Sequence, residues 1–245
     1  DVDWATENWT YENGNIDEGV EFSVVCVIEG YTYVPDNNFE QTLVDLGYDT
    51  AVDDVVLTEN ISGVTELEIQ EKAISDLTGI EAFTALTSLN CENNQLTSLD
   101  VSNNTALTDF NCSNNQLTTL DVSNNTALEI LNIPYNSLTT LDLSANTALT
   151  NLGCHSNQLT SLDVSSNTAL SKLECGDNQL TTLDVSSNTA LYSLKCYNNQ
   201  LTSLNVSNNT ALDYLACNNN QLTSLDVSNN TALTDFNCSN NQLTT

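Results

Sequence analysis

Residues 107–127 read LTDFNCSNNQLTTLDVSNNTA, and the same 21-residue block recurs down two thirds of the chain. The copies share the template LxxLxCxxNQLTxLDVSxNTA and begin at Leu86, Leu107, Leu128, Leu149, Leu170, Leu191, Leu212 and Leu233. A fixed period of this length is the signature of a solenoid, in which each repeat adds one turn to a stack. A single block cannot fold alone, because burying each apolar side chain contributes roughly 1.5–3 kcal/mol whereas ordering each residue costs about 1–2 kcal/mol.

Each block contains two halves with alternating apolar positions, one around Leu-x-Cys and one around Leu-x-Val. Alternation of this kind predicts two short strands per turn, each followed by a corner where Asn satisfies backbone groups. We therefore expect a repeat solenoid with two short parallel β-sheets, one per half-repeat, and little helix outside an N-terminal cap.

The phrase LxxLxCxxNxL resembles the leucine-rich-repeat signature, with Cys at an apolar position. The second half, LxxLDVSxN, resembles the variant called IRREKO, in which the variable segment of the repeat is itself a shortened leucine-rich motif. This resemblance covers residues 86–245. Residues 64–85 form one longer repeat whose phrase ISDLTGIEAFTAL resembles internalin-type repeats, although Lys72 stands where the repeated Asn is expected. We interpret it as a transition repeat.

Upstream, the stretch PDNNFEQTLVDLGYD places Phe39, Leu43 and Leu46 at helical spacing behind Asp36, a candidate N-cap. We predict a helical cap over residues 31–63. Cap and repeats together resemble secreted surface proteins of Bacteroidetes-type bacteria, which implies a secreted or cell-surface location. Residues 1–30 do not fit the repeat and predict two strands or the tail of a preceding domain.

The chain stops at Thr245 inside a repeat. Solenoids need polar caps on their open sheet edges. We therefore expect either a piece of a longer protein or an end that docks onto something, with end-to-end self-association as one form of docking.

The charge balance narrows the class of partner. The chain has 33 acidic residues, three lysines and a formal charge of −30. Nucleic acids and anionic membrane surfaces are therefore poor partners. There is no apolar run of membrane-spanning length, so no membrane insertion is expected.

Seven of the eight cysteines occupy the same inward repeat position, which Ile133 fills in the remaining repeat. They are Cys91, Cys112, Cys154, Cys175, Cys196, Cys217 and Cys238. A position that accepts Ile is a packing position, so we favour buried free thiols. Disulfides between rungs and a metal site are the alternatives, because rungs lie about 4.8 Å apart. Cys26 lies outside this row and is not assigned.

Two rows of Asn run through the repeats, one from Asn94 to Asn241 and the other from Asn104 to Asn230. We interpret both as structural ladders that satisfy backbone groups of the loops.

Function is expected at outward positions that vary while the framework stays constant. Beside the Cys positions, three outward rows differ from repeat to repeat, and in leucine-rich repeats this strand lines the usual recognition surface. Lysines lie beside aromatic rings in the central repeats, and such rings stack on sugars or peptides. The candidate ligand-binding residues are His155, Lys172, Glu174, Tyr192, Lys195, Tyr197 and Tyr214. The competing interpretation is drift on a solvated sheet.

The other half-repeat is uniform. The candidate residues for binding a regular lattice form one row, which is accompanied by rows of Asp and Ser. They are Thr118, Thr139, Thr160, Thr181, Thr202 and Thr223. This regular hydroxyl array resembles the flat Thr arrays of ice-binding solenoids, which implies binding of ice or another lattice. A carboxylate at each rung argues against ice. Stacked carboxylates are also able to share calcium. The third interpretation is that Thr, Asp and Ser hydrogen-bond locally.

The sequence indicates that the protein is not an enzyme, because it has one His, no nucleophile elbow and no glycine-rich phosphate loop. No cofactor is expected, apart from the calcium just considered. The resulting hypothesis is an extracellular recognition or adhesion module that binds a protein or glycan at a cell surface through its variable face. The alternative is a lattice binder or structural scaffold that uses the uniform Thr face.

Overall fold

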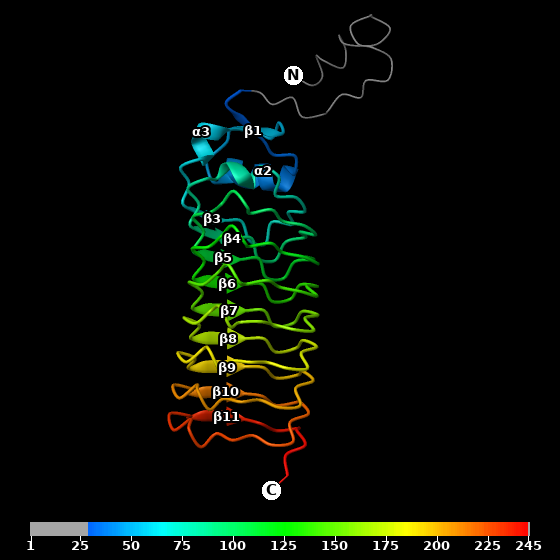
Figure 1. Ribbon diagram of the computed structural model, residues 1–245. Coiled ribbons are helices and arrows are strands. Elements are labelled where there is room, and N and C mark those ends of the chain that lie inside the picture. Colours follow the sequence, from blue (N-terminus) through cyan, green and yellow to red (C-terminus); the bar gives the residue numbers. More distant parts are fainter. Residues whose placement is uncertain (1–28, 245) are drawn as a thin grey trace, which may run out of the picture.

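The computed structural model describes residues 29–244, which form one elongated stack of repeats below a small cap (Figure 1). Nine three-residue strands form a single parallel sheet whose order follows the sequence. They are β3 (Glu66–Glu68), β4 (Ser88–Asn90), β5 (Asp109–Asn111), β6 (Ile130–Asn132), β7 (Asn151–Gly153), β8 (Lys172–Glu174), β9 (Ser193–Lys195), β10 (Tyr214–Ala216) and β11 (Asp235–Asn237). The predicted leucine-rich-repeat type of solenoid is confirmed.

The strands stay in register, so that the middle residue of each strand aligns with the middle residue of the next. In β3 to β10 this residue is buried, and the two residues beside it face outward to varying degrees. Side chains alternate between the two faces of a strand. The inward residues join one continuous apolar core that runs from Val34 to Leu222.

The second predicted sheet is wrong, because no strand forms in the Leu-x-Val halves of the described repeats. Side chains there occupy the backbone groups that a sheet would use. In one rung, Ser123 N–H donates to Asp121 Oδ1, while the Val122 carbonyl accepts from Asn146 Nδ2. Side-chain bonds of this type compete with strand pairing. Each turn therefore has one strand and one irregular segment.

The cap consists of β1 (Tyr31–Tyr33), which pairs antiparallel with β2 (Val55–Leu57), and the helices α2 (Asn37–Asp45) and α3 (Thr58–Ile61). The 3-10 helix η1 (Ile80–Ala82) follows in the first repeat. Asp36 caps α2, as predicted, since its Oδ1 accepts from Asn38 N and Phe39 N. Its Oδ2 accepts from Ser75 N and Asp76 N, which ties the cap to the first repeat. The strands expected within residues 1–30 fall mostly outside the described residues.

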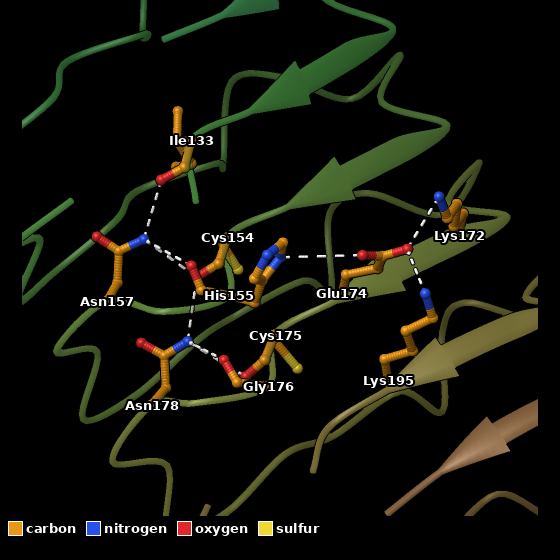
Figure 2. Close-up of polar contacts among 10 residues, drawn as sticks. All are labelled: Ile133, Cys154, His155, Asn157, Lys172, Glu174, Cys175, Gly176, Asn178 and Lys195. Atoms are coloured by element: carbon orange, nitrogen blue, oxygen red, sulfur yellow. Dashed lines mark hydrogen bonds and ion pairs between the residues drawn. The ribbon is translucent and has the colours of Figure 1, made fainter. Parts of the chain in front are cut away.

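Both Asn rows form the predicted ladders. In the first row, Asn157 Oδ1 accepts from Leu138 N, and its Nδ2 donates to the carbonyls of Ile133, Cys154 and His155 (Figure 2). In the second row, Asn167 Nδ2 donates to the carbonyls of Leu143 and Asn146. The ladders thus join consecutive turns through side chains.

The cysteines of the repeats are free thiols, and all but Cys238 are buried. Burial raises the pKa of the Cys91, Cys154 and Cys217 thiols to about 12. The packing interpretation of this row is therefore confirmed, while Cys26 lies outside the described residues. Within residues 29–244, none of the helices has the length and apolar character needed to cross a bilayer.

Candidate functional site

The candidate site lies on the outward face of the sheet around β8. Lys172 and Glu174 flank the buried Leu173, so the alternation of the strand turns both charged side chains outward. The parallel register places Lys195 of β9 beside Glu174. His155 follows β7 and reaches Glu174 from the neighbouring rung (Figure 2).

Three nitrogen-bearing side chains converge on the Glu174 carboxylate. Lys172 Nζ lies 2.9 Å and Lys195 Nζ lies 3.0 Å from Glu174 Oε1. His155 Nδ1 lies 3.8 Å from Oε2. Partial burial acts to raise the pKa of Glu174, but hydrogen bonds and charge from both lysines outweigh it and hold the pKa below its ordinary value. Glu174 therefore stays ionised and fixes both ammonium groups.

His155 is largely enclosed. Its ring meets that of Tyr135 edge to face, with 5.3 Å between the centroids and 81° between the planes. Burial lowers the pKa of His155, and Lys195 and Lys172 lower it further, against the opposing pull of Glu174 and Asp177. The imidazole is consequently neutral at pH 7 and adds no positive charge.

Aromatic rings border the charged group. Lys195 Nζ lies 5.5 Å from the centroid of the Tyr214 ring, within the range of a cation–π contact. The Tyr197 ring lies over Gly176, where a Cβ would come within 2.7 Å of Tyr197 Cζ. Burial raises the pKa of the Tyr197 hydroxyl, and nearby Asp177 raises it further, so this side chain remains a neutral donor.

Two hollows meet at His155. One, with a volume of about 290 Å³, is lined by Ile130, Asn151, Gly153, Lys172 and Glu174 among others. The other, of about 340 Å³, is lined by Glu92, Ser113, Pro134 and Tyr135 among others. The surface between β5 and β8 is therefore concave where the charged group lies.

The arrangement is suited to binding polar ligand groups. Each ammonium has three N–H donors and directs one toward Glu174, so donors remain for a ligand. The side chains of Lys172 and Lys195 are 40% and 32% exposed, which keeps these donors accessible. Ligand oxygens are the matching acceptors, and the tyrosine faces suit sugar rings or peptide groups.

Six of the seven predicted residues meet in this region: His155, Lys172, Glu174, Lys195, Tyr197 and Tyr214. Tyr192 directly precedes β9 and is exposed, and its backbone carbonyl accepts from Tyr214 N. The sequence analysis did not identify Tyr135 and Asp177. Both have positive φ values, of 54° and 50°, at a position where most repeats have Asn. A bulky residue rarely adopts such a φ, so the replacement of the usual Asn by Tyr135 could have been noticed in the sequence.

The uniform Thr row lies in the irregular half of each turn, and all six residues are exposed. The accompanying Asp row has a local role: in each rung the Ser N–H donates to the side chain two residues earlier, as from Ser165 to Asp163 Oδ1. The hydrogen bond from the Ser165 hydroxyl and the one from its N–H lower the pKa of Asp163. The hydrogen bonds support the local interpretation of Asp and Ser. Lattice binding by the Thr row stays a prediction.

Comparisons with known proteins place this geometry in context. A family model for the LVIVD repeat matches residues 202–236. Internalin J of Listeria monocytogenes is 43% identical over 73 residues, which are 30% of this chain and 8% of that protein. The solved functional domain of this internalin, reported to include a cysteine ladder, is 39% identical with a TM-score of 0.73. That match covers 88% of this chain and 53% of the solved domain, so the chain spans about half of it.

More distant structures share the fold alone. Internalin C2 of Listeria monocytogenes is 21% identical with a TM-score of 0.78, covering 85% of this chain and 99% of that structure. The leucine-rich-repeat ectodomain of a plant membrane receptor kinase from Arabidopsis thaliana is 24% identical with a TM-score of 0.65. That match covers 74% of this chain and 23% of the ectodomain, which was solved in complex with CASPARIAN STRIP INTEGRITY FACTOR 2.

Proposed function

We propose that this chain, a leucine-rich-repeat solenoid similar to internalins, is an extracellular recognition or adhesion module. Its ligand is a protein or a glycan, bound on the variable strand face at the group formed by His155, Lys172, Glu174 and Lys195. The convergence of both lysines on one carboxylate, above a hollow in an otherwise acidic chain, carries this proposal.

Charge supports the location of the site. Lys172 and Lys195 are two of the three lysines in a chain with a formal charge of −30 and no arginine. Their positive charge is therefore concentrated on β8 and β9, where it attracts ligand groups that the rest of the surface repels. A carboxylate, a sulfate or an array of sugar hydroxyls has the oxygen acceptors that such donors require.

The extracellular setting is supported by the similarity to internalin J and by the strongly acidic composition. The receptor-kinase ectodomain illustrates that this fold can carry a binding surface for another molecule. Binding rather than catalysis fits a group whose only histidine is enclosed and held away from protonation.

The proposal is tested by screening the chain on a glycan array and on a panel of purified extracellular proteins. The strongest saturating ligand is then titrated against Lys172→Gln and Lys195→Gln. The matched control is Thr181→Val, an exposed change on the uniform face. Weakening by the lysine variants alone supports the proposal. Weakening only by Thr181→Val overturns it in favour of the uniform face.

A further inference from the structure

The cap contains a carboxylate that neither the core nor the strand face explains. Glu40 lies in α2 and is fully buried. Its Oε1 accepts hydrogen bonds from Asp53 N and Val55 N at 2.9 and 3.0 Å. Its Oε2 is also buried but has no hydrogen-bond partner among residues 29–244. Leaving a buried charged oxygen unpaired is energetically costly, so we expect a bound group to contact this atom.

A second carboxylate in the loop after α2 has the same feature. Asp49 Oδ1 accepts from Thr50 N, whereas its Oδ2 is buried and has no hydrogen-bond partner in the described part of the chain. Asp53 completes the group from the exposed side of the loop. One carboxylate oxygen from each of Glu40, Asp49 and Asp53 lies within 4.8 Å of the others.

These distances match one ion better than three separate acids. Calcium takes oxygen ligands at about 2.3–2.6 Å, so ligands on opposite sides of one ion are about 4.6–5.2 Å apart. Without a cation, three carboxylates this close repel one another, and the buried Glu40 Oε2 and Asp49 Oδ2 have no partner among residues 29–244. A bound cation removes both penalties.

We propose that Glu40, Asp49 and Asp53 form a calcium site in the cap. The donors are all carboxylate oxygens, which suit Ca²⁺ or Mg²⁺ better than Zn²⁺, whose protein sites include His or Cys ligands. Irregular loop geometry favours Ca²⁺, because Mg²⁺ demands near-ideal octahedral geometry. Asp53 is exposed, so water completes the coordination from that side.

Such an ion stabilises a specific part of the fold. It joins α2, through Glu40, to the loop that leads into β2, through Asp49 and Asp53. This cap covers the N-terminal end of the core, where Phe39 meets Phe83 with 6.3 Å between the ring centroids. The site is separate from the lysines of β8 and β9, so the inference does not depend on the proposed function.

The test is calorimetric titration of calcium chloride into the chelator-treated chain, with thermal unfolding in calcium and in EGTA. We expect saturable binding and a Tm that rises with calcium concentration. Asp49→Asn and Asp53→Asn each lower affinity at least tenfold, since even residues that merely orient metal ligands change affinity by about 10- to 100-fold. Magnesium chloride in place of calcium gives weaker binding.

The matched control is Asp54→Asn, which removes a neighbouring exposed acid outside the group and leaves affinity unchanged. Glu40→Gln retains an oxygen for Asp53 N and Val55 N, so it is at least as stable as the native chain in EGTA and less stable in calcium. Absence of a calcium effect on the native Tm overturns the proposal. An equal loss of affinity in Asp54→Asn also overturns it, since that indicates diffuse attraction.

Discussion

The ring of Tyr197 occupies the space that a side chain at Gly176 would need, with only 2.7 Å between Tyr197 Cζ and a Cβ placed on Gly176. The two residues lie at equivalent positions of adjacent repeats, because each directly follows a cysteine of the inward row. Absence of a side chain in one rung thus allows an aromatic ring of the next rung to lie against the sheet.

Gly176→Ala is predicted to displace the Tyr197 ring without disturbing the backbone. We expect a loss of about 0.5–1.5 kcal/mol in the free energy of unfolding, the range for a side chain forced off its rotamer. Chemical denaturation measures it. In a Tyr197→Ala background the cost of Gly176→Ala should disappear, and an equal cost in both backgrounds contradicts the contact.

The only histidine of the chain makes its titration simple to follow. Burial lowers the pKa of His155 below 6.5, and Lys195 lowers it further, whereas Glu174 raises it. By NMR we expect a midpoint below 6.5, a higher midpoint in Lys195→Gln and a lower one in Glu174→Gln. Because the folded state binds the proton less readily than the unfolded state, His155 makes stability fall as pH drops from 6.5 toward the folded pKa. A midpoint at or above 6.5 contradicts this account.

The two Asn ladders are expected to differ in strength. Asn157→Ala leaves the buried Leu138 N–H without its acceptor and removes donations to three carbonyls, each of which keeps another donor. We expect a loss on the order of 3 kcal/mol in the free energy of unfolding. The Asn167 side chain only donates, to two carbonyls, and its Oδ1 has no partner among the described residues. Asn167→Ala is therefore expected to lower the free energy of unfolding by roughly 1–2 kcal/mol. Denaturation midpoints compare the variants, and a reversed order refutes the difference.

The buried cysteines of the repeats are predicted to resist modification by thiol reagents. Burial raises the pKa of the Cys154 thiol to about 12, so almost no thiolate forms at neutral pH. In a Cys26→Ser chain, Ellman's reagent should react readily with the partly exposed Cys238 and with the others only as fast as the repeats open. Rapid reaction of several thiols in the native state is the contrary result.

The repeat predicts the stack well, because the positions of Leu173 and its equivalents are set by one strict period. It fails for the second sheet because Leu-x-Val has the same alternation as Leu-x-Cys. Only the hydrogen bonds of Asp121 and Asn146 show that the backbone there is already occupied. Alternation of apolar residues alone does not report where N–H and C=O groups find partners.

The candidate site shows a similar division. Departure from the repeat consensus identified Lys172, Glu174 and Lys195, since the register of adjacent strands aligns equivalent positions. The role of Gly176 and the contact of Tyr135 with His155 depend on distances between neighbouring rungs, which no single repeat encodes. The group at Glu40 was also missed, because its members come from a helix and a loop outside the repeats.

The most direct test of the central claim is the affinity of the ligand selected on the arrays for the native chain, Lys195→Gln and Thr181→Val. Losing a hydrogen-bonded charge at an interface typically costs about 2–5 kcal/mol, so we predict that Lys195→Gln weakens binding by at least tenfold. Thr181→Val should leave the affinity unchanged. Unchanged affinity in Lys195→Gln together with a marked loss in Thr181→Val would contradict recognition through the variable strand face.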